Sequence, residues 1–156
     1  MTTYEKLIVA AEEDGCIVKE KNLVKYDGLI QGNRIAIRST IPTEAEKACV
    51  LAEEIGHYHT GYGNILCQDD IMNRKQEYRG RLYGANLTIG LYGIVSAAKA
   101  KCTNQYEVAQ HLNVPEWYLA EALKMYENKY GAGVALDNYW IMFTPYLQVF
   151  EYMPMK

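Results

Sequence analysis

The sequence has little of what marks membrane, secreted or nucleic-acid-binding proteins. No apolar run approaches the roughly 20 residues needed to span a bilayer, and the N-terminus lacks the basic stretch and long apolar run of a secretion signal. The formal net charge of −3 gives no electrostatic reason to expect a direct nucleic-acid or membrane partner. The 4 cysteines form no CxxC pair, which disfavours a thiolate-only metal site and is typical of reduced thiols. We therefore expect a cytoplasmic protein.

The composition is that of one globular domain. Hydrophobic residues make up 49% of the chain and charged residues 22%, and 156 residues are enough to bury a core without disulfides. There is no internal repeat, low-complexity stretch or clear linker, so we expect a single domain over residues 1–156. Tyrosine occurs 14 times against 2 phenylalanines, which fits core packing and also an interaction surface with a wet edge.

The first half of the sequence predicts helices around a small sheet. Apolar spacing predicts a helix over 3–14, which a glycine ends. The apolar stretches 28–31 and 34–38 flank Gly32-Asn33, a two-residue hairpin signal, and this predicts a small antiparallel sheet.

Two helices are predicted in the middle of the chain. Thr43 and Glu46 form a capping box that starts a helix over about 44–58. A second helix begins near 71 and runs towards 87. Glycines recur in this region, and they either allow close helix packing or weaken the helix. They are Gly80, Gly84 and Gly90.

The last third of the sequence predicts a helix-turn-helix-like pair and then strands. Helices over 105–112 and from Pro115 to about 130 are joined by a tight turn. The subregion of about 104–130 therefore resembles a helix-turn-helix. The segment 138–152 is aromatic and β-branched enough for one or two strands, with a proline between them. The predicted fold class is α+β and mainly helical.

The helix pair also suggests a DNA-binding regulator, which is the least favoured alternative. Phosphate contacts demand net positive charge, and the second helix of the pair does not supply it. Packing against the rest of the chain, or holding a protein substrate, is the preferred interpretation. The charged residues are Glu116, Glu121 and Glu127 against Lys124 and Lys129.

The candidate chemistry lies on the helix over about 44–58. Glu53 and His57 are four residues apart and so share one helix face, while Glu54 is rotated by about 100°. This is the spacing of the H-E-x-x-H zinc helix with a carboxylate in place of the first histidine. In such sites the outer two side chains bind Zn²⁺ and the intervening glutamate is the general base. The same pattern also occurs on solvated helix faces that bind nothing.

Several segments together resemble the ImmA/IrrE family of metallopeptidases, which are often encoded by phages and integrative elements. They are VLAEEIGHYHT at 50–60, GNIL at 63–66, NRKQEYR at 73–79 and DNY at 137–139. The similarity covers roughly residues 20–150.

The resemblance implies a minimal zincin-like metallopeptidase fold and the activity of a zinc-dependent endopeptidase. It implies Zn²⁺ held by Glu53, His57 and a downstream acid, Glu77, with Glu54 as the general base. It also implies a specific protein substrate, a helix-turn-helix repressor of a phage or mobile element.

Two departures from the family pattern favour an alternative. Glu53 stands where the best-studied pattern has histidine, and Arg81 stands where the following helix usually has an acid or amide that would support the motif's histidine. The alternative is a catalytically weak or inactive protein with the peptidase fold that binds and sequesters a regulator.

Other candidate residues have weaker patterns. His59 or Tyr58 would stabilise an oxyanion if the helix frayed before Gly61, and otherwise His59 is a partly exposed histidine. His111 is interpreted as structural, the pair Asp69-Asp70 as a cap or solvated loop, and Cys67 as an idle thiol.

Overall fold

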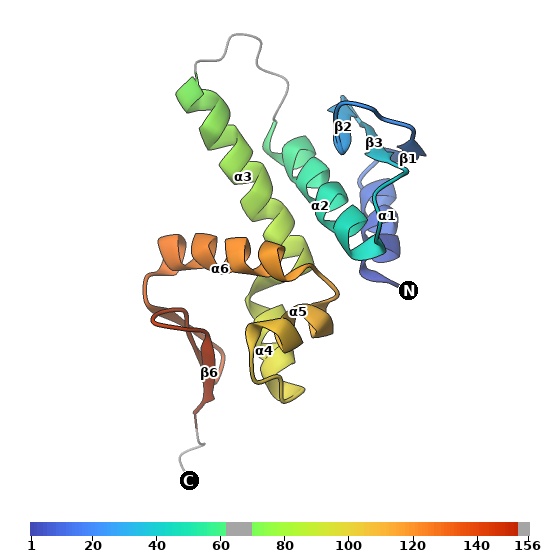
Figure 1. The fold of residues 1–156 in the computed structure, drawn as a ribbon. Coiled ribbons are helices and arrows are strands. Elements are labelled where there is room, and N and C mark those ends of the chain that lie inside the picture. The colour runs from blue at the N-terminus through green and yellow to red at the C-terminus, as the bar shows by residue number, and fades with distance from the viewer. Residues whose placement is uncertain (62–69, 153–156) are drawn as a thin grey trace. The chain divides into compact units, whose positions relative to one another are not determined.

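The structure is a computed structural model that describes residues 1–61 and 70–152 (Figure 1). The chain divides into two compact units, Met1–Thr88 and Ile89–Lys156. Both contain helices and one small sheet, so the predicted α+β class is confirmed. That residues 1–156 form a single domain stays a prediction. Among the described residues, no helix is both long and apolar enough to cross a membrane.

The first unit places helices around a three-stranded sheet in the order β1-β3-β2. The hairpin of β2 and β3 is antiparallel, as predicted, but β1 runs parallel to β3, so the prediction of a purely antiparallel sheet is wrong here. Apolar alternation does not reveal β1, because four of its five residues are exposed. The elements are α1 (Thr3–Glu13), β1 (Ile17–Lys21), β2 (Gly28–Gln31), β3 (Arg34–Arg38), α2 (Glu44–Thr60) and α3 (Asp70–Thr88).

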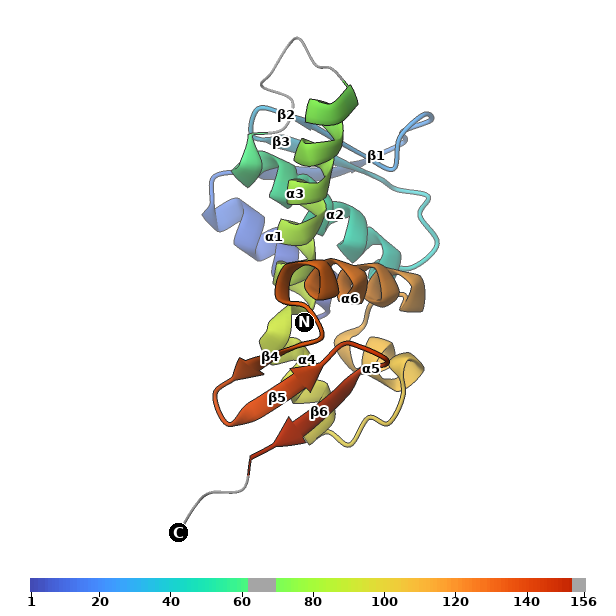
Figure 2. The ribbon, with the colours of Figure 1, turned by 90° about the vertical axis from the view of Figure 1, so that its left-hand side faces the viewer.

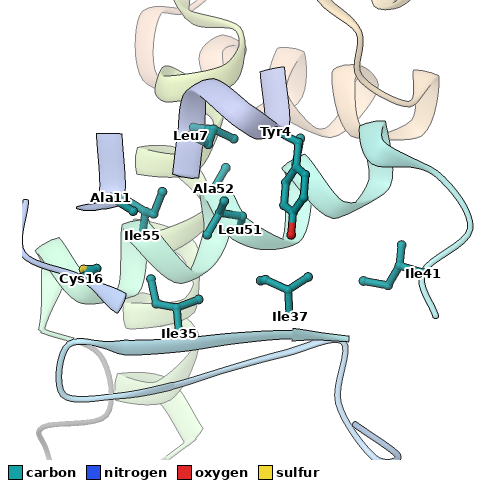
Figure 3. Close-up of a cluster of buried hydrophobic side chains, with 11 residues drawn as sticks. Tyr4, Leu7, Ala11, Cys16, Ile35, Ile37, Ile41, Leu51, Ala52 and Ile55 are labelled. Carbon is teal, nitrogen blue, oxygen red and sulfur yellow. The ribbon is translucent and has the colours of Figure 1, made fainter. Parts of the chain in front are cut away.

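The core of the first unit fixes α2 against the sheet. Ile35 and Ile37 of β3 point towards Leu51 and Ile55 of α2 and Leu7 of α1 (Figure 3). Burying each of these side chains contributes about 1.5–3 kcal/mol. This packing uses one face of α2 and leaves another face for α3.

Glycines let α2 and α3 approach closely. A Cβ added to Gly56 of α2 would collide with the backbone carbonyl of Gly80 of α3. A Cβ on Gly84 would lie 2.8 Å from the carbonyl oxygen of Ala52. Gly80 and Gly84 therefore serve close packing, whereas Gly90 has φ +62° and marks the break after α3.

The second unit contains the predicted helix pair and an antiparallel meander, β4-β5-β6 (Figure 2). Asn113 adopts the left-handed conformation (φ 55°, ψ 47°) that turns the chain between the two helices. Neither α4 nor β4 is predicted by the sequence patterns, while the two later strands lie where expected. The elements are α4 (Gly90–Lys99), α5 (Gln105–Leu112), α6 (Glu116–Tyr130), β4 (Gly133–Leu136), β5 (Tyr139–Met142) and β6 (Gln148–Glu151).

Candidate metal centre

Glu53, His57 and Glu77 come together between α2 and α3. One potential ligand atom from each lies within 4.8 Å of the other two. His57 Nε2 is 3.6 Å from Glu53 Oε1 and 3.7 Å from Glu77 Oε2. The i, i+4 spacing on α2 and the close approach of α3 produce this cluster.

The donor set fits a small divalent ion. Nitrogen and oxygen ligands about 2.0–2.2 Å from a tetrahedral zinc are roughly 3.4 Å apart. The two nitrogen-to-oxygen distances, 3.6 Å and 3.7 Å, are close to that value. One imidazole and two carboxylates are also a ligand combination that zinc accepts. Small side-chain adjustments would therefore suffice to hold an ion.

The cluster is closed on the histidine side and open on the carboxylate side. His57 is buried, with 3% of its surface exposed, because Gly80 has no side chain and leaves room for the ring. The side chains of Glu53 and Glu77 are each 32% exposed. A site with this asymmetry has a fixed nitrogen donor and a face that water or a substrate can reach.

The pKa values of the two carboxyl groups, Glu53 and Glu77, are shifted in opposite directions. The hydrogen bond with Glu53, helped by burial, raises the pKa of Glu77 to about 7. Burial alone would raise the pKa of Glu53, but contacts with His57, Glu77 and Arg81 outweigh it and lower that pKa to about 2. Without a metal, Glu77 is therefore mostly protonated below about pH 7 and can share that proton with Glu53.

His57 is polarised by the surrounding carboxylates. Burial alone would lower the pKa of its imidazole, but the hydrogen bond to Glu53 and the charges of Glu54 and Glu77 raise it. The ring is thus surrounded by negatively charged carboxylates, and their charge favours the binding of a cation beside it.

Glu54 is not one of the three clustered groups, although its charge interacts with theirs, and its Oε1 lies near Gly28 of β2. A Cβ at Gly28 of β2 would lie 3.1 Å from Glu54 Oε1 and 2.7 Å from Val50 Cγ1, so the bare glycine makes room for the carboxylate. Burial raises the pKa of Glu54 to about 7. A carboxyl group with such a pKa can take up and release a proton near neutral pH.

Arg81 belongs to the same cluster, which the sequence reasoning missed. Its Nε is 3.5 Å from Glu77 Oε1 and 3.7 Å from Glu53 Oε1. The spacing of Glu77 and Arg81 by four residues on one helix is the signal that could have revealed the pair. Arg81 therefore supplies positive charge next to both carboxylates, a role that its place in the family pattern does not predict.

The other histidines lie elsewhere. His59 Nε2 is 2.8 Å from Asp14 Oδ2, and its ring stacks on Tyr83 at 4.8 Å between centroids. The helix continues to Thr60 before Gly61 ends it, so the fraying required for an oxyanion role is absent. His111 pairs with Ser96 at 2.9 Å, in keeping with a structural role. The interpretations of Cys67 and of the side chains of Asp69 and Asp70 lie outside the described residues.

Comparisons of the chain with protein-family models, with curated proteins and with solved structures give no match.

Proposed function

We propose that the protein is a zinc-dependent endopeptidase with a minimal zincin-like fold. Glu53, His57 and Glu77 hold the ion, and Glu54 is the general base. The observation that carries this proposal is the convergence of one imidazole and two carboxylates from two adjacent helices, within 4.8 Å of one another. The acidic i, i+4 motif alone does not distinguish a site from a solvated helix face, whereas this convergence favours a site.

The chemistry of each residue is consistent with peptide hydrolysis. An ion held by these ligands would supply Lewis-acid catalysis. Glu54, with its pKa near 7, accepts a proton from attacking water on a carboxylate oxygen and returns it to the leaving amine. Glu53 and His57 are fixed by the packing of α2, and Glu77 is brought to them by α3.

The position of β2 supports a peptide as the substrate. Among the described strands, β2 pairs with β3 alone, so its second edge offers backbone donors and acceptors. An extended peptide can add to such an edge by main-chain hydrogen bonds. Gly28 of β2 lies against Glu54, so a peptide paired there would have its backbone near the proposed base.

The identity of the substrate is proposed from the sequence resemblance. The ImmA/IrrE-like segments suggest a helix-turn-helix repressor of a phage or mobile element, cleaved as a specific protein target. A direct nucleic-acid partner is not part of this proposal, since the net charge of −3 does not favour one.

Metal content and cleavage test the proposal directly. Purified protein should contain close to one equivalent of zinc and cut a helix-turn-helix repressor of the proposed class, tested first on any such repressor encoded beside its own gene. Glu54→Gln should retain the metal and lose cleavage by at least about 100-fold, since general-base catalysis typically contributes that much. Glu44→Gln, on an exposed position of the same helix, is the matched control and should cleave normally. Absence of zinc, or equal cleavage by Glu54→Gln and wild type, would overturn the enzyme proposal.

A second candidate is a binding protein that keeps the fold without turnover. Arg81 favours it, because a guanidinium beside Glu53 and Glu77 opposes a bound cation. This candidate predicts a stable complex with the intact repressor, no cleavage, and a complex unaffected by Glu54→Gln. Accumulation of cleaved repressor would dispose of it.

A further inference from the structure

The positively charged guanidinium of Arg81 lies beside Glu53 and Glu77, the two carboxylates that would attract a divalent cation. We propose that Arg81 competes with the metal for Glu53 and thereby weakens the affinity of the site, so that loading requires the guanidinium to leave that carboxylate. This inference rests on the metal site proposed above. It assigns to Arg81 the role of setting how readily the site is occupied.

The two carboxylates meet Arg81 in different ways. Glu53 uses one oxygen for both neighbours, because Oε1 is 3.6 Å from His57 Nε2 and 3.7 Å from Arg81 Nε. Glu77 divides its oxygens, with Oε2 at 3.7 Å from His57 Nε2 and Oε1 at 3.5 Å from Arg81 Nε.

This difference identifies the contact that must change. Glu77 can bind an ion through Oε2 and keep Arg81 on Oε1, the partner four residues further along the same helix. Glu53 Oε1 has no such freedom, because the oxygen that faces His57 is also the one that faces Arg81. Competition is therefore centred on Glu53, the ligand that stands in place of a histidine in the zinc-helix pattern.

Arg81 is able to withdraw. Its side chain is 52% exposed, so its guanidinium can move into water while its backbone stays in α3. A long, flexible charged side chain on a helix surface loses little when it exchanges one surface contact for solvent. The main free-energy cost of binding the metal is then the loss of the attraction between the Arg81 guanidinium and the Glu53 carboxylate.

Metal affinity measured without reference to catalysis tests the inference. Zinc binding to metal-free protein is followed by competition with a chromophoric chelator. Arg81→Ala should bind zinc about tenfold more tightly than wild type, because Glu53 Oε1 then has no guanidinium to release before it binds the ion. Arg81→Lys keeps the charge and should remain within about threefold of wild type. Arg79→Ala removes the same charge from an exposed position of the same helix and should leave the affinity unchanged.

A second background localises the effect. In Glu53→Gln the charge that Arg81 neutralises is gone, so adding Arg81→Ala should change the zinc affinity by less than about threefold. An equal tightening in both backgrounds would overturn the assignment of the competition to Glu53.

The outcomes separate this inference from the proposed function. If wild type and variants bind zinc equally, or if Arg81→Ala binds it more weakly, the competition is overturned while the metal site stands. If no variant binds zinc, both the metal site and the inference built on it are overturned. Circular dichroism of each metal-free variant establishes that the folded protein is being compared.

Discussion

Gly80 lies directly against the imidazole of His57, so closely that a Cβ at position 80 would be 2.5 Å from the ring's Cε1 and closer still to Nδ1. The same glycine meets Gly56 of α2 through its backbone. The geometry of the candidate ligand His57 therefore depends on the absence of a side chain on the neighbouring helix.

Gly80→Ala should disrupt the site although it adds only a methyl group. The ring of His57 is confined, so either it rotates or α3 moves away, and overpacking of this kind costs about 1–3 kcal/mol of unfolding free energy. Zinc affinity should fall by at least about tenfold, because His57 leaves its position relative to Glu53. Urea unfolding and chelator competition measure the two effects.

Gly93→Ala is the matched control for that substitution. Gly93 also lies inside a helix, but its added Cβ would meet only the end of the Leu112 side chain, at 3.2 Å. Alanine favours helix over glycine, so stability should be unchanged or higher. A Gly80→Ala protein with wild-type stability and affinity would show that the two helices are not held as closely as described.

The metal-free protein should lose stability as the pH rises from about 4.5 to about 7. The pKa of Glu54 is raised from 4.5 to about 7 by burial, and that of Glu77 is raised to a similar value by its hydrogen bond with Glu53. Both groups bind a proton more tightly in the folded than in the unfolded chain, so their contribution is complete below pH 4.5 and lost as the pH rises through 7. For Glu54 the shift corresponds to about 3 kcal/mol at most.

Urea titrations between pH 4.5 and 8 in the presence of a chelator measure this loss. Glu54→Gln should make the profile less steep, because glutamine does not titrate and only the contribution of Glu77 remains, and it should be more stable than wild type at pH 8. Glu44→Gln should keep the wild-type slope. An unchanged slope in Glu54→Gln would mean that the carboxyl group of Glu54 is hydrated and not held against Gly28.

Local patterns in the sequence were sufficient for the elements that carry the site. Thr43 accepts a hydrogen bond from the backbone N–H of Glu46 at 3.1 Å, as expected of a helix start, and α2 begins at the next residue. The placement of Glu53 and His57 on one face of that helix follows from its period alone. The nearness of Glu77 came from the family resemblance, because no local rule states which residues of two helices will meet.

What the sequence did not reveal depends on contacts between distant segments. β1 is a mostly exposed strand defined by its pairing with β3, and no alternation marks it. The contact of Arg81 with Glu53 joins α3 to α2, and a family pattern read along one helix does not predict it. The role of Gly28 depends on the side chain of Glu54, which lies 26 positions away in the sequence and reaches it only after folding.

Zinc should stabilise the wild-type protein and fail to stabilise variants of its proposed ligands. At free zinc about 100 times the Kd, the expected gain in unfolding free energy is about 2.7 kcal/mol. His57→Ala and Glu77→Gln each remove one of the clustered donors and should show little or no rise in Tm on zinc addition. Glu44→Gln is the control and should gain as much as wild type. A full gain in His57→Ala would place the ion elsewhere in the chain.

His59→Ala should weaken the fold and leave the metal site intact. His59 connects three helices, through its 2.8 Å contact with Asp14 after α1 and its stacking on Tyr83 of α3. Losing one exposed polar contact and one ring contact should lower the unfolding free energy by about 1 kcal/mol. Zinc affinity should stay within about twofold of wild type, because His59 does not belong to the cluster of Glu53, His57 and Glu77. A tenfold loss of affinity with unchanged stability would instead make His59 a ligand and exclude the ligand set assigned to α2 and α3.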